Sequence, residues 1–514
     1  MPDPRPIVLR LQNITKRFGA LTANDAIDLD LGRGEVLALL GENGAGKTTL
    51  MNILFGHYVA DEGAVQVAGD DGVLAPLEPG SPGAALAAGI GMVHQHFTLA
   101  ENLTGLENIV LGTESIFRLS RRTGPARRKI GEVMADSGLT VDLDVPVSRL
   151  TVGERQRVEI LKALYRDARI LVMDEPTAVL TPQESDSLFV TMRALAARGL
   201  AVVFISHKLG EVLAISDRIA VLRGGAKVGE MVTADANRRS IAEMMVGREV
   251  PASQRVAREP GAVLLELAGV SVAGAHRRTL VDASLTIREG EIVGIAGVSG
   301  NGQAALAALV AGLERPSGGA MHLFGAPVTR HDPGHFARAG IARIPEDRHH
   351  DGVVGAMTVA ENVALEELRQ PGFQRGGFLR FGAIRARAEA AIRDYDVRCP
   401  GPDTAARLLS GGNIQKLILA RVLDRQPRLV LANQPTRGLD IGAQTEVHRR
   451  LLAAREAGVG VILISEDLDE LTALSDRIAV MTGGRLSKTM AADTLDRGTL
   501  GLMMAGHRDE EEAA

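Results

Sequence analysis

Short runs of apolar residues, rich in Val and Ile, recur along the chain. The clearest are Glu35–Leu40, Arg169–Met173, Ala201–Ser206, Arg428–Ala432 and Gly460–Ser465. Runs of this length and composition are typical of strands buried on both faces of a parallel sheet. No window approaches the ~20 apolar residues that a membrane-spanning helix needs, and Met1–Leu11 has no apolar signal region. The pattern therefore predicts buried parallel strands, and we expect neither secretion nor a membrane span.

The apolar pattern repeats once along the chain. Ser216–Gly225 reads SDRIAVLRGG, and Ser475–Gly484, 259 residues later, reads SDRIAVMTGG. Nearly the same spacing separates three further pairs, namely Gly41 and Gly297, Gly153 and Gly412, and Pro176 and Pro435. The chain is thus predicted to hold two copies of one unit of about 250 residues. We expect the units at 1–246 and 262–506, a linker at 247–261 and an acidic tail at 507–514.

Composition narrows the classes of protein. The 514 residues are 45% apolar, enough to bury sizeable cores. The net charge of −5 gives no electrostatic reason to expect a nucleic-acid partner. The lone cysteine, Cys399, excludes an internal disulfide framework and a cysteine-rich metal site. Glycine is frequent, with 58 residues, which directs attention to glycine-rich loops.

One such loop follows the strand Glu35–Leu40 directly and precedes the helical pattern Thr49–Phe55. It reads GENGAGKT, the strand–GxxxxGK[ST]–helix arrangement of a phosphate-binding loop. Glycines let backbone N–H groups turn toward phosphate oxygens, the lysine reaches the terminal phosphates, and the hydroxyl can bind Mg²⁺. The residues that we predict to bind phosphate are Gly41, Glu42, Asn43, Gly44, Ala45, Gly46, Lys47, Thr48 and Thr49.

A pair of acids ends the second buried strand of the first half. Asp174 and Glu175 follow Arg169–Met173 directly. Beside a phosphate loop, the first acid can hold Mg²⁺ through water and the second can polarise the attacking water. The pair predicts hydrolysis of a nucleotide rather than binding alone.

These motifs make the first half resemble the nucleotide-binding domain of ABC transporters. Leu150–Gln156, LTVGERQ, is similar to the LSGGQ signature of that family, with Thr151 in place of serine and Val152 in place of glycine. The resemblance further identifies Gln95, in MVHQH, as the Q-loop glutamine and a magnesium ligand. It makes His207, in FISHK, the switch histidine, and Phe18, in KRFGA, the aromatic that stacks on adenine.

The resemblance covers essentially the whole chain, twice, and implies the fold of each half. We expect a P-loop α/β core with a central, mostly parallel sheet, an antiparallel β subdomain and a helical subdomain. By the same resemblance, the pairs Glu107-Asn108 and Glu361-Asn362 begin the helical subdomain that meets a membrane partner.

The second half departs from the family pattern at each catalytic position. Its loop, GVSGNGQA, has Gln303 for the lysine and Ala304 for the hydroxyl residue. Amides end its second strand, and acids replace the Q-loop glutamine and the switch histidine. The changed positions are Gly274 (opposite Phe18), Gln303, Ala304, Glu346, Asn433, Gln434 and Glu466.

The signature motifs show the opposite asymmetry. The second half has LSGGN, with Ser410, Gly411, Gly412 and Asn413, and keeps the D-loop aspartate Asp440. The first half has Thr151, Val152 and, at the D-loop position, Thr181. In the family, two domains pair head to tail, and each ATP lies between one phosphate loop and the other domain's signature. On that geometry the losses collect in one composite site, so we expect one hydrolytic site and one degenerate site.

The resemblance also implies the chemistry. We expect ATP and Mg²⁺ as cofactors, with Lys47, Glu175 and His207 catalytic and Thr48, Gln95 and Asp174 on the metal. ATP would close the two halves, and hydrolysis would let them separate.

PEDR at Pro345–Arg348, MVHQHFTLAENLTGLENIVLG and GNGQ resemble ATPases of bacterial sugar and nucleoside importers, most closely the nucleoside branch. The implied partners are two permease subunits and, indirectly, an extracytoplasmic solute-binding protein, at the cytoplasmic face of the inner membrane. A simple-sugar importer is the alternative.

A tandem ATPase of translation would show a long charged linker, and one of repair would carry zinc-finger cysteines. A non-catalytic regulatory module is opposed by the complete first set of motifs.

Overall fold

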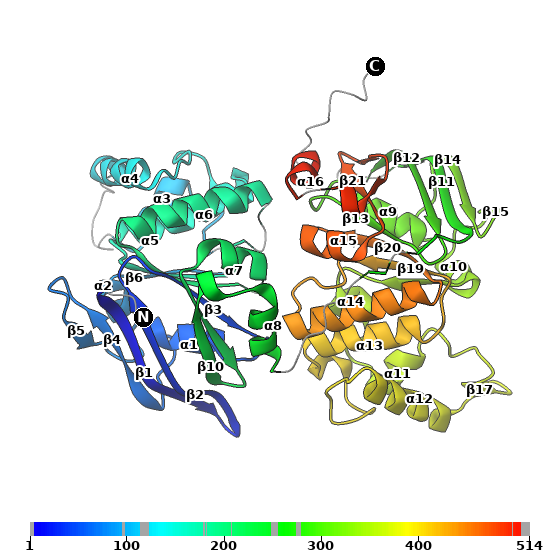
Figure 1. Cartoon of the computed structure of the whole chain (residues 1–514), viewed down its shortest axis with the longest axis horizontal. Coiled ribbons are helices and arrows are strands. Elements are labelled where there is room, and N and C mark those ends of the chain that lie inside the picture. Colours follow the sequence, from blue (N-terminus) through cyan, green and yellow to red (C-terminus); the bar gives the residue numbers. More distant parts are fainter. Residues whose placement is uncertain are drawn as a thin grey trace, which may run out of the picture. The chain divides into compact units, whose positions relative to one another are not determined.

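The structure is a computed structural model in which the described residues are 5–94, 98–113, 123–177, 180, 182–206, 208–247, 255–256, 258–273, 279–495 and 497–504. The chain divides into two units, Met1–Val250 and Pro251–Ala514 (Figure 1). The division falls inside the linker predicted from the sequence. No helix in the described ranges combines the length and apolar character needed to cross a membrane.

The central sheet of the first unit has the strand order β10-β9-β3-β8-β7-β6. Its neighbours are parallel except for the antiparallel pair β9 and β10. Every residue of β3 and β8 is buried, which confirms the prediction from the apolar runs. The strands are β3 (Val36–Gly41), β6 (Ile90–Val93), β7 (Ile170–Asp174), β8 (Ala201–Ile205), β9 (Arg218–Arg223) and β10 (Ala226–Val232).

An antiparallel sheet of order β2-β1-β4-β5 forms a second layer. One hydrophobic core joins it to α1 and the central sheet, with Leu11, Met51 and Leu39 as members from the three layers. The layer therefore fixes where β2 meets the start of α1. Its strands are β1 (Ile7–Phe18), β2 (Leu21–Gly32), β4 (Glu62–Ala68) and β5 (Leu74–Pro76).

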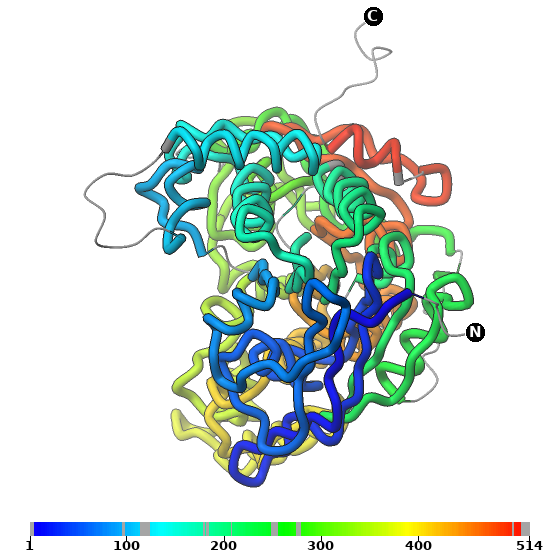
Figure 2. Tube along the Cα trace, turned by 90° about the vertical axis from the view of Figure 1, so that its left-hand side faces the viewer, coloured from blue at the N-terminus to red at the C-terminus, as the bar shows by residue number. Residues whose placement is uncertain are grey.

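The helices of the first unit cover the central sheet and build a helical subdomain from α3, α4 and α5. The subdomain lies on the opposite side of the central sheet from the antiparallel layer (Figures 1 and 2). The helices are α1 (Lys47–Leu54), α2 (Pro82–Ala87), α3 (Gly105–Val110), α4 (Thr123–Ser137), α5 (Val152–Tyr165), α6 (Pro182–Ala197), α7 (Leu209–Ile215) and α8 (Arg238–Val246).

The Glu-Asn pair at the start of this subdomain has a structural role. Glu107 closes a capping box with Thr104 at the start of α3. Asn108 is buried, and its amide exchanges hydrogen bonds of 2.8 and 3.0 Å with the backbone of Ala100. Glu361 and Asn362 repeat both features in the second unit. The pair thus fixes the entry of the chain into the subdomain.

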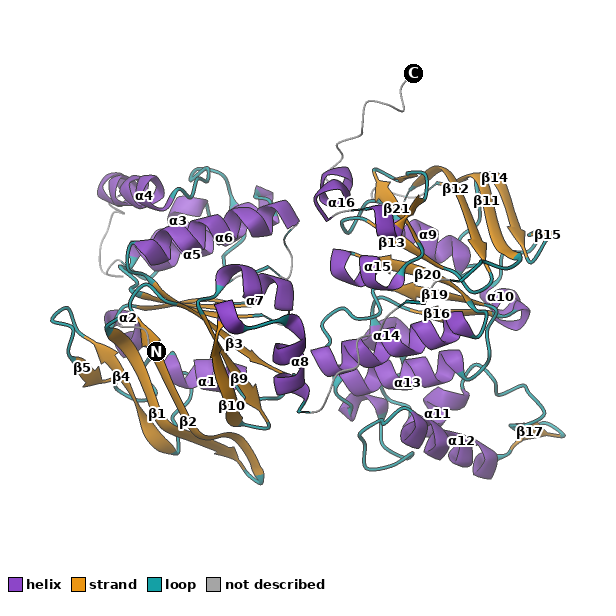
Figure 3. Ribbon diagram, viewed as in Figure 1, coloured by secondary structure: helices purple, strands orange, loops and turns teal. Residues whose placement is uncertain are grey.

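The second unit repeats the architecture (Figure 3). Its central sheet runs β16-β19-β20-β13-β21-β22, with β23 also paired to β21, and its antiparallel sheet runs β12-β11-β14-β15. A hairpin of β17 and β18 precedes α12. The strands are β11 (Val263–Val272), β12 (Leu280–Arg288), β13 (Ile292–Ala296), β14 (Gly318–Leu323), β15 (Ala326–Pro327), β16 (Ile341–Ile344), β17 (Gln374–Arg375), β18 (Phe378–Leu379), β19 (Leu429–Asn433), β20 (Gly460–Ser465), β21 (Arg477–Thr482), β22 (Arg485–Leu486) and β23 (Met490–Ala491).

The helices of the second unit follow the same order as those of the first. They are α9 (Gln303–Val310), α10 (Pro333–Ala339), α11 (Val359–Ala364), α12 (Phe381–Asp394), α13 (Gly411–Leu423), α14 (Ile441–Glu456), α15 (Leu468–Leu474) and α16 (Arg497–Met504). The last residues of the predicted linker pack on this unit. Arg455, almost fully buried, donates to the carbonyl of Val256 at 2.9 Å, and Arg258 donates to the carbonyl of Arg455 at 3.2 Å.

Candidate nucleotide-binding site

The phosphate loop of the first unit joins β3 to α1 and depends on glycine. Gly44 and Gly46 have φ of 84° and 98°, in the left-handed region. A Cβ on Gly46 would lie 2.2 Å from the carbonyl oxygen of Ala23. The loop is therefore pressed against β2, and Gly46 leaves room for that contact.

Asn24, on β2, holds the loop from behind and was not predicted from the sequence. Its amide Nδ2 donates to the carbonyl of Gly46 at 3.1 Å, and the side chain is fully buried. Within the described residues, its Oδ1 has no hydrogen-bond partner. Asn24 pairs with Lys16 across the strands, and the same register in the second unit pairs Val272 with Leu280. Leu280 therefore occupies in the second unit the buried position that Asn24 has in the first. This replacement of an apolar residue by a polar one between the two repeats is the sequence signal that could have identified Asn24.

Lys47 begins α1 and lies against the loop. Its Nζ donates to the carbonyls of Gly41 at 2.6 Å and Glu42 at 3.1 Å. Asn43 and Thr48 are exposed at the rim of the loop. The ammonium group and the hydroxyl of Thr48 are thus presented together, where the helix N-terminus favours an anion.

The acid pair follows β7. Glu175 has φ of 47°, and its N–H donates to the carbonyl of Ile205 on β8 at 2.9 Å. The pKa of Asp174 is raised, chiefly by burial and then by the adjacent Glu175 carboxylate, while Lys47 and His94 act in the opposite direction. The two carboxylates and Lys47 therefore lie within electrostatic reach of one another.

These donors fit a magnesium ion. The half-buried Asp174 carboxylate and the Thr48 hydroxyl are hard oxygen ligands, and a cation would offset the two causes that raise the pKa of Asp174, its burial and the adjacent Glu175 carboxylate. The described residues contain no cluster of three or more His, Cys, Asp or Glu side chains suited to a metal. A magnesium ion would therefore draw most of its ligands from phosphate and water, as this ion prefers.

Phe18 ends β1 and is 45% exposed, so its ring is available for stacking. The Phe18 ring makes an edge-to-face contact with Tyr58, at 5.6 Å between ring centroids. The Nζ of Lys16 lies 5.5 Å from the centroid of the Phe18 ring. Tyr58 was not predicted from the sequence. Phe18 belongs to the sheet that contacts the phosphate loop through β2, and Tyr58 lies in the connection between α1 and β4.

Four predicted positions lie outside the described residues. They are Gln95, Thr181, His207 and Gly274. Their roles remain predictions from the family resemblance.

The second unit retains the backbone of the site and changes its side chains. Gln434 has φ of 49°, and its N–H donates to the carbonyl of Ile464 at 2.8 Å, as Glu175 does to Ile205. Asn433 is buried at the end of β19, and Ala304 is exposed in the first turn of α9. Gln434 therefore has the backbone conformation that Glu175 has in the first unit, but its side chain is an amide.

The signature segments begin the helices α5 and α13 and are capped differently. Thr151 and Glu154 form a capping box, in which Glu154 accepts from the Thr151 N–H at 2.8 Å. Val152 is the first residue of α5 and is exposed. Ser410 is the N-cap position of α13, and in the described residues no side chain caps that helix. The Asn413 amide donates to Ser410 Oγ at 2.9 Å instead. The second signature thus leaves its first N–H groups open to an anion.

The loop after β16 braces the second signature. The guanidinium of Arg348 lies 3.1 to 3.3 Å from where a Cβ on Gly411 would stand, and it donates to the carbonyl of Arg437 at 2.6 Å. Glu346 pairs with Arg437 at 2.5 Å. Gly412 lies in the first turn of α13, and Asp440 accepts from the N–H of Ala443 at 2.8 Å and so caps α14. Glu346 is thus a bracing residue of the second unit.

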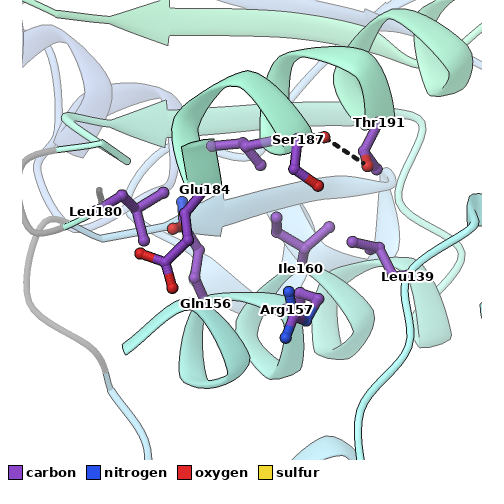
Figure 4. A pocket seen from close by; sticks show the side chains of 10 residues that line it. Leu139, Gln156, Arg157, Ile160, Leu180, Glu184, Ser187 and Thr191 are labelled. Carbon is purple, nitrogen blue, oxygen red and sulfur yellow. Dashed lines mark hydrogen bonds between the residues drawn. The ribbon is translucent and has the colours of Figure 1, made fainter. Parts of the chain in front are cut away.

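The pocket drawn in Figure 4 lies between α5 and α6 and does not belong to the nucleotide site. It holds about 30 Å³ and is lined by residues such as Leu139, Ile160 and Glu184. That volume admits a water molecule or two and no larger ligand. Gln156, on its edge, donates to the carbonyl of Pro176 at 2.7 Å, which ties the signature helix to the segment after Glu175.

A phosphate loop between β3 and α1, an acid pair at the end of β7 and the signature helices α5 and α13 define an ABC-type ATPase. The model of the family described as ABC transporter matches residues 24–178 and 280–437, and the chain belongs to this family. It is an ATP-binding and ATP-hydrolysing member of it.

Full-length relatives share the tandem organisation. The glucose import ATP-binding protein TsgD13 of Haloferax volcanii is 44% identical over 98% of this chain and 97% of its own length. The nucleoside import ATP-binding protein NupA of Lactococcus lactis subsp. cremoris is 43% identical over 97% and 98%. The guanosine import ATP-binding protein NupO of Bacillus subtilis is 42% identical over 98% of both chains.

Among solved structures, an archaeal ribosome recycling factor in complex with the stalk protein aP1 matches with a TM-score of 0.62. It is 20% identical and covers 97% of this chain and 94% of its own. This likeness shows the fold alone.

Proposed function

We propose that the chain is the ATP-hydrolysing subunit of an importer for nucleosides. The supporting observation is full-length similarity, above 40% identity, to two proteins named for nucleoside and guanosine import. The motifs quoted from the sequence favour the same branch.

Import of a simple sugar is the second candidate. A relative of similar identity is named for glucose import, and one at 40% identity is named for ribose import. Uptake of labelled nucleosides and of glucose or ribose, in a strain that lacks this chain and in the complemented strain, separates the two. Restored nucleoside uptake with unchanged sugar uptake supports the proposal, and the reverse result selects the sugar importer.

The partners proposed are two permease subunits, with a solute-binding protein acting outside the membrane, and the place of work is the cytoplasmic face of the membrane. Co-purification of the tagged chain with a polytopic membrane protein tests this. Recovery with ribosomal particles instead would favour a role in translation.

In the proposed mechanism, hydrolysis occurs at one composite site. The first unit supplies Phe18, Lys47, Thr48, Asp174 and Glu175, joined by Gln95 and His207, and the second unit supplies Ser410, Gly411, Gly412, Asn413 and Asp440. On the head-to-tail pairing that the family resemblance implies, Lys47 and the N-terminus of α13 would bind the terminal phosphate from its two sides. Glu175 orients the attacking water, and Mg²⁺ held by Thr48 and Asp174 would offset the charge that develops on the phosphate.

The pairing of unlike halves has its own test. Ser410→Ala should lower ATP turnover, because the serine faces the terminal phosphate of the complete site. Thr151→Ala should leave turnover close to the unchanged chain, because Thr151 belongs to the degenerate site. Equal losses in the two variants would contradict a single hydrolytic site.

A further inference from the structure

The second phosphate loop, residues 297–302, is bonded to a carboxylate of its own chain. Glu466 follows β20 at the position where the first unit has His207. Its Oε1 accepts a hydrogen bond of 2.8 Å from the N–H of Ser299, in the middle of the loop. An N–H of such a loop is the donor that would otherwise face a phosphate oxygen.

Gln303 satisfies the same loop from the other side. Its Nε2 donates to the carbonyl of Val298 at 3.0 Å, as Lys47 does to the carbonyl of Glu42 in the first unit. Its Oε1, however, accepts from the N–H of Asn301 at 3.1 Å. The Gln303 side chain therefore lies against the loop as that of Lys47 does in the first unit. It accepts a hydrogen bond from a loop N–H, however, and it adds no positive charge.

The loop thus has the shape of an anion site in which side chains of the protein accept from two of its N–H groups, those of Ser299 and Asn301. Gly302, the N-cap of α9, has φ of 112°, so the turn into the helix is kept. The N-terminus of the eight-residue helix α9 favours negative charge, and the carboxylate of Glu466 places a negative charge on the loop that leads into it. A triphosphate would have to displace this carboxylate or lie beside it, against like charge.

We infer that Glu466 acts as a built-in anion that closes the second phosphate loop to nucleotide. In the second unit, a carboxylate of the protein then takes the place of a nucleotide phosphate. The first signature shows the same kind of change independently, since Glu154 accepts from the Thr151 N–H at the start of α5. The inference concerns the second unit alone and holds whichever solute is carried.

Nucleotide binding by the full chain tests the inference. In a Lys47→Ala background, which weakens the first loop, Mg-ATP affinity is measured by isothermal titration for Gln303→Lys and for Gln303→Lys with Glu466→Ala. We expect the second variant to bind at least about tenfold more tightly, since both a competing hydrogen bond and a like charge are removed. Equal affinities would overturn the inference.

Two further variants serve as controls for this measurement. Gln303→Lys with Glu466→His places the residue type of the first unit at this position and should bind as tightly as the alanine variant, which covers the case in which alanine unsettles the loop. Gln303→Lys with Asp469→Ala removes an acid three residues further along the chain, in the first turn of α15. It should bind like Gln303→Lys alone, and a gain equal to that of Glu466→Ala would overturn a specific role for Glu466.

The number of nucleotides bound by the unsubstituted protein provides an independent test. The protein should bind one nucleotide per chain at concentrations that saturate the first loop. Two nucleotides bound with similar affinity would overturn the inference.

Discussion

The buried amide of Asn24 donates a hydrogen bond of 3.1 Å to the carbonyl of Gly46, the N-cap residue of the phosphate-loop helix α1. That carbonyl shares its peptide group with the N–H of Lys47 and also accepts from the N–H of Leu50 at 2.9 Å. The second hydrogen bond fixes the peptide plane, and with it the direction in which the Lys47 N–H points. Asn24 is therefore a positioning residue that acts on nucleotide through the loop.

Asn24→Leu should weaken nucleotide binding without harming the fold. Leucine fits because Leu280 occupies the same register in the second unit. Loss of one hydrogen bond, about 0.5–1.5 kcal/mol, corresponds to roughly 2- to 12-fold in Kd. ATP and ADP should lose affinity equally, and kcat should change little, because the loop peptide binds ground state and transition state alike.

The thermal midpoint separates this effect from simple destabilisation. Asn24 Oδ1 is buried without a partner in the described residues, so leucine should keep or raise Tm while affinity falls. Leu280→Asn is the matched control and should leave ATP affinity and turnover unchanged. A fall in Tm with unchanged Kd for the folded protein would contradict a positioning role.

Asp174→Asn should stabilise the nucleotide-free chain in a pH-dependent way. Burial and Glu175 raise the pKa of Asp174, so the folded state binds its proton more tightly than the unfolded chain. The stability from that proton is present below the unfolded pKa and is lost as the pH rises through the folded pKa. Thermal unfolding of both proteins from about pH 4, near the unfolded pKa, to about pH 7 should show a gain in Tm for the variant that grows as the pH rises through the folded pKa. A gain independent of pH would contradict the electrostatic origin.

The sequence predicted the features that depend on short, local patterns. The apolar runs gave the central strands, and the loop of glycines before Lys47 gave the phosphate site, because both are encoded within a few residues. The capping box of Thr151 and Glu154 is also legible locally, as T-x-x-E. Contacts between distant segments could not be read in this way. The hydrogen bonds of Asn24 to Gly46 and of Glu466 to Ser299 depend on strand register and on how β20 sits beside the loop, which the pattern of residue types does not specify.

Glu175→Gln should abolish ATP turnover while leaving ATP bound. The second unit shows that glutamine accepts this backbone, since Gln434 has φ of 49° where Glu175 has 47°. The variant therefore removes the carboxylate without rearranging the loop. Loss of a group that activates water costs about 10²- to 10⁴-fold in kcat. Phosphate release and ATP binding, measured side by side, check this, and turnover within tenfold of the unchanged chain would contradict one hydrolytic site.

The reverse change, Gln434→Glu, should restore almost nothing. The backbone is suited to a catalytic acid, but the second unit still lacks the lysine, the hydroxyl and the first acid, since Gln303, Ala304 and Asn433 replace them. Its phosphate loop also remains bonded to Glu466. An activating carboxylate acts only on a nucleotide that is bound and oriented, so one restored group cannot act alone. The measurement is ATP turnover in a Lys47→Ala background, where activity from the first loop is suppressed. Turnover should stay at the level of Lys47→Ala itself, and a clear rise above it would mean that the second loop binds ATP in spite of Glu466.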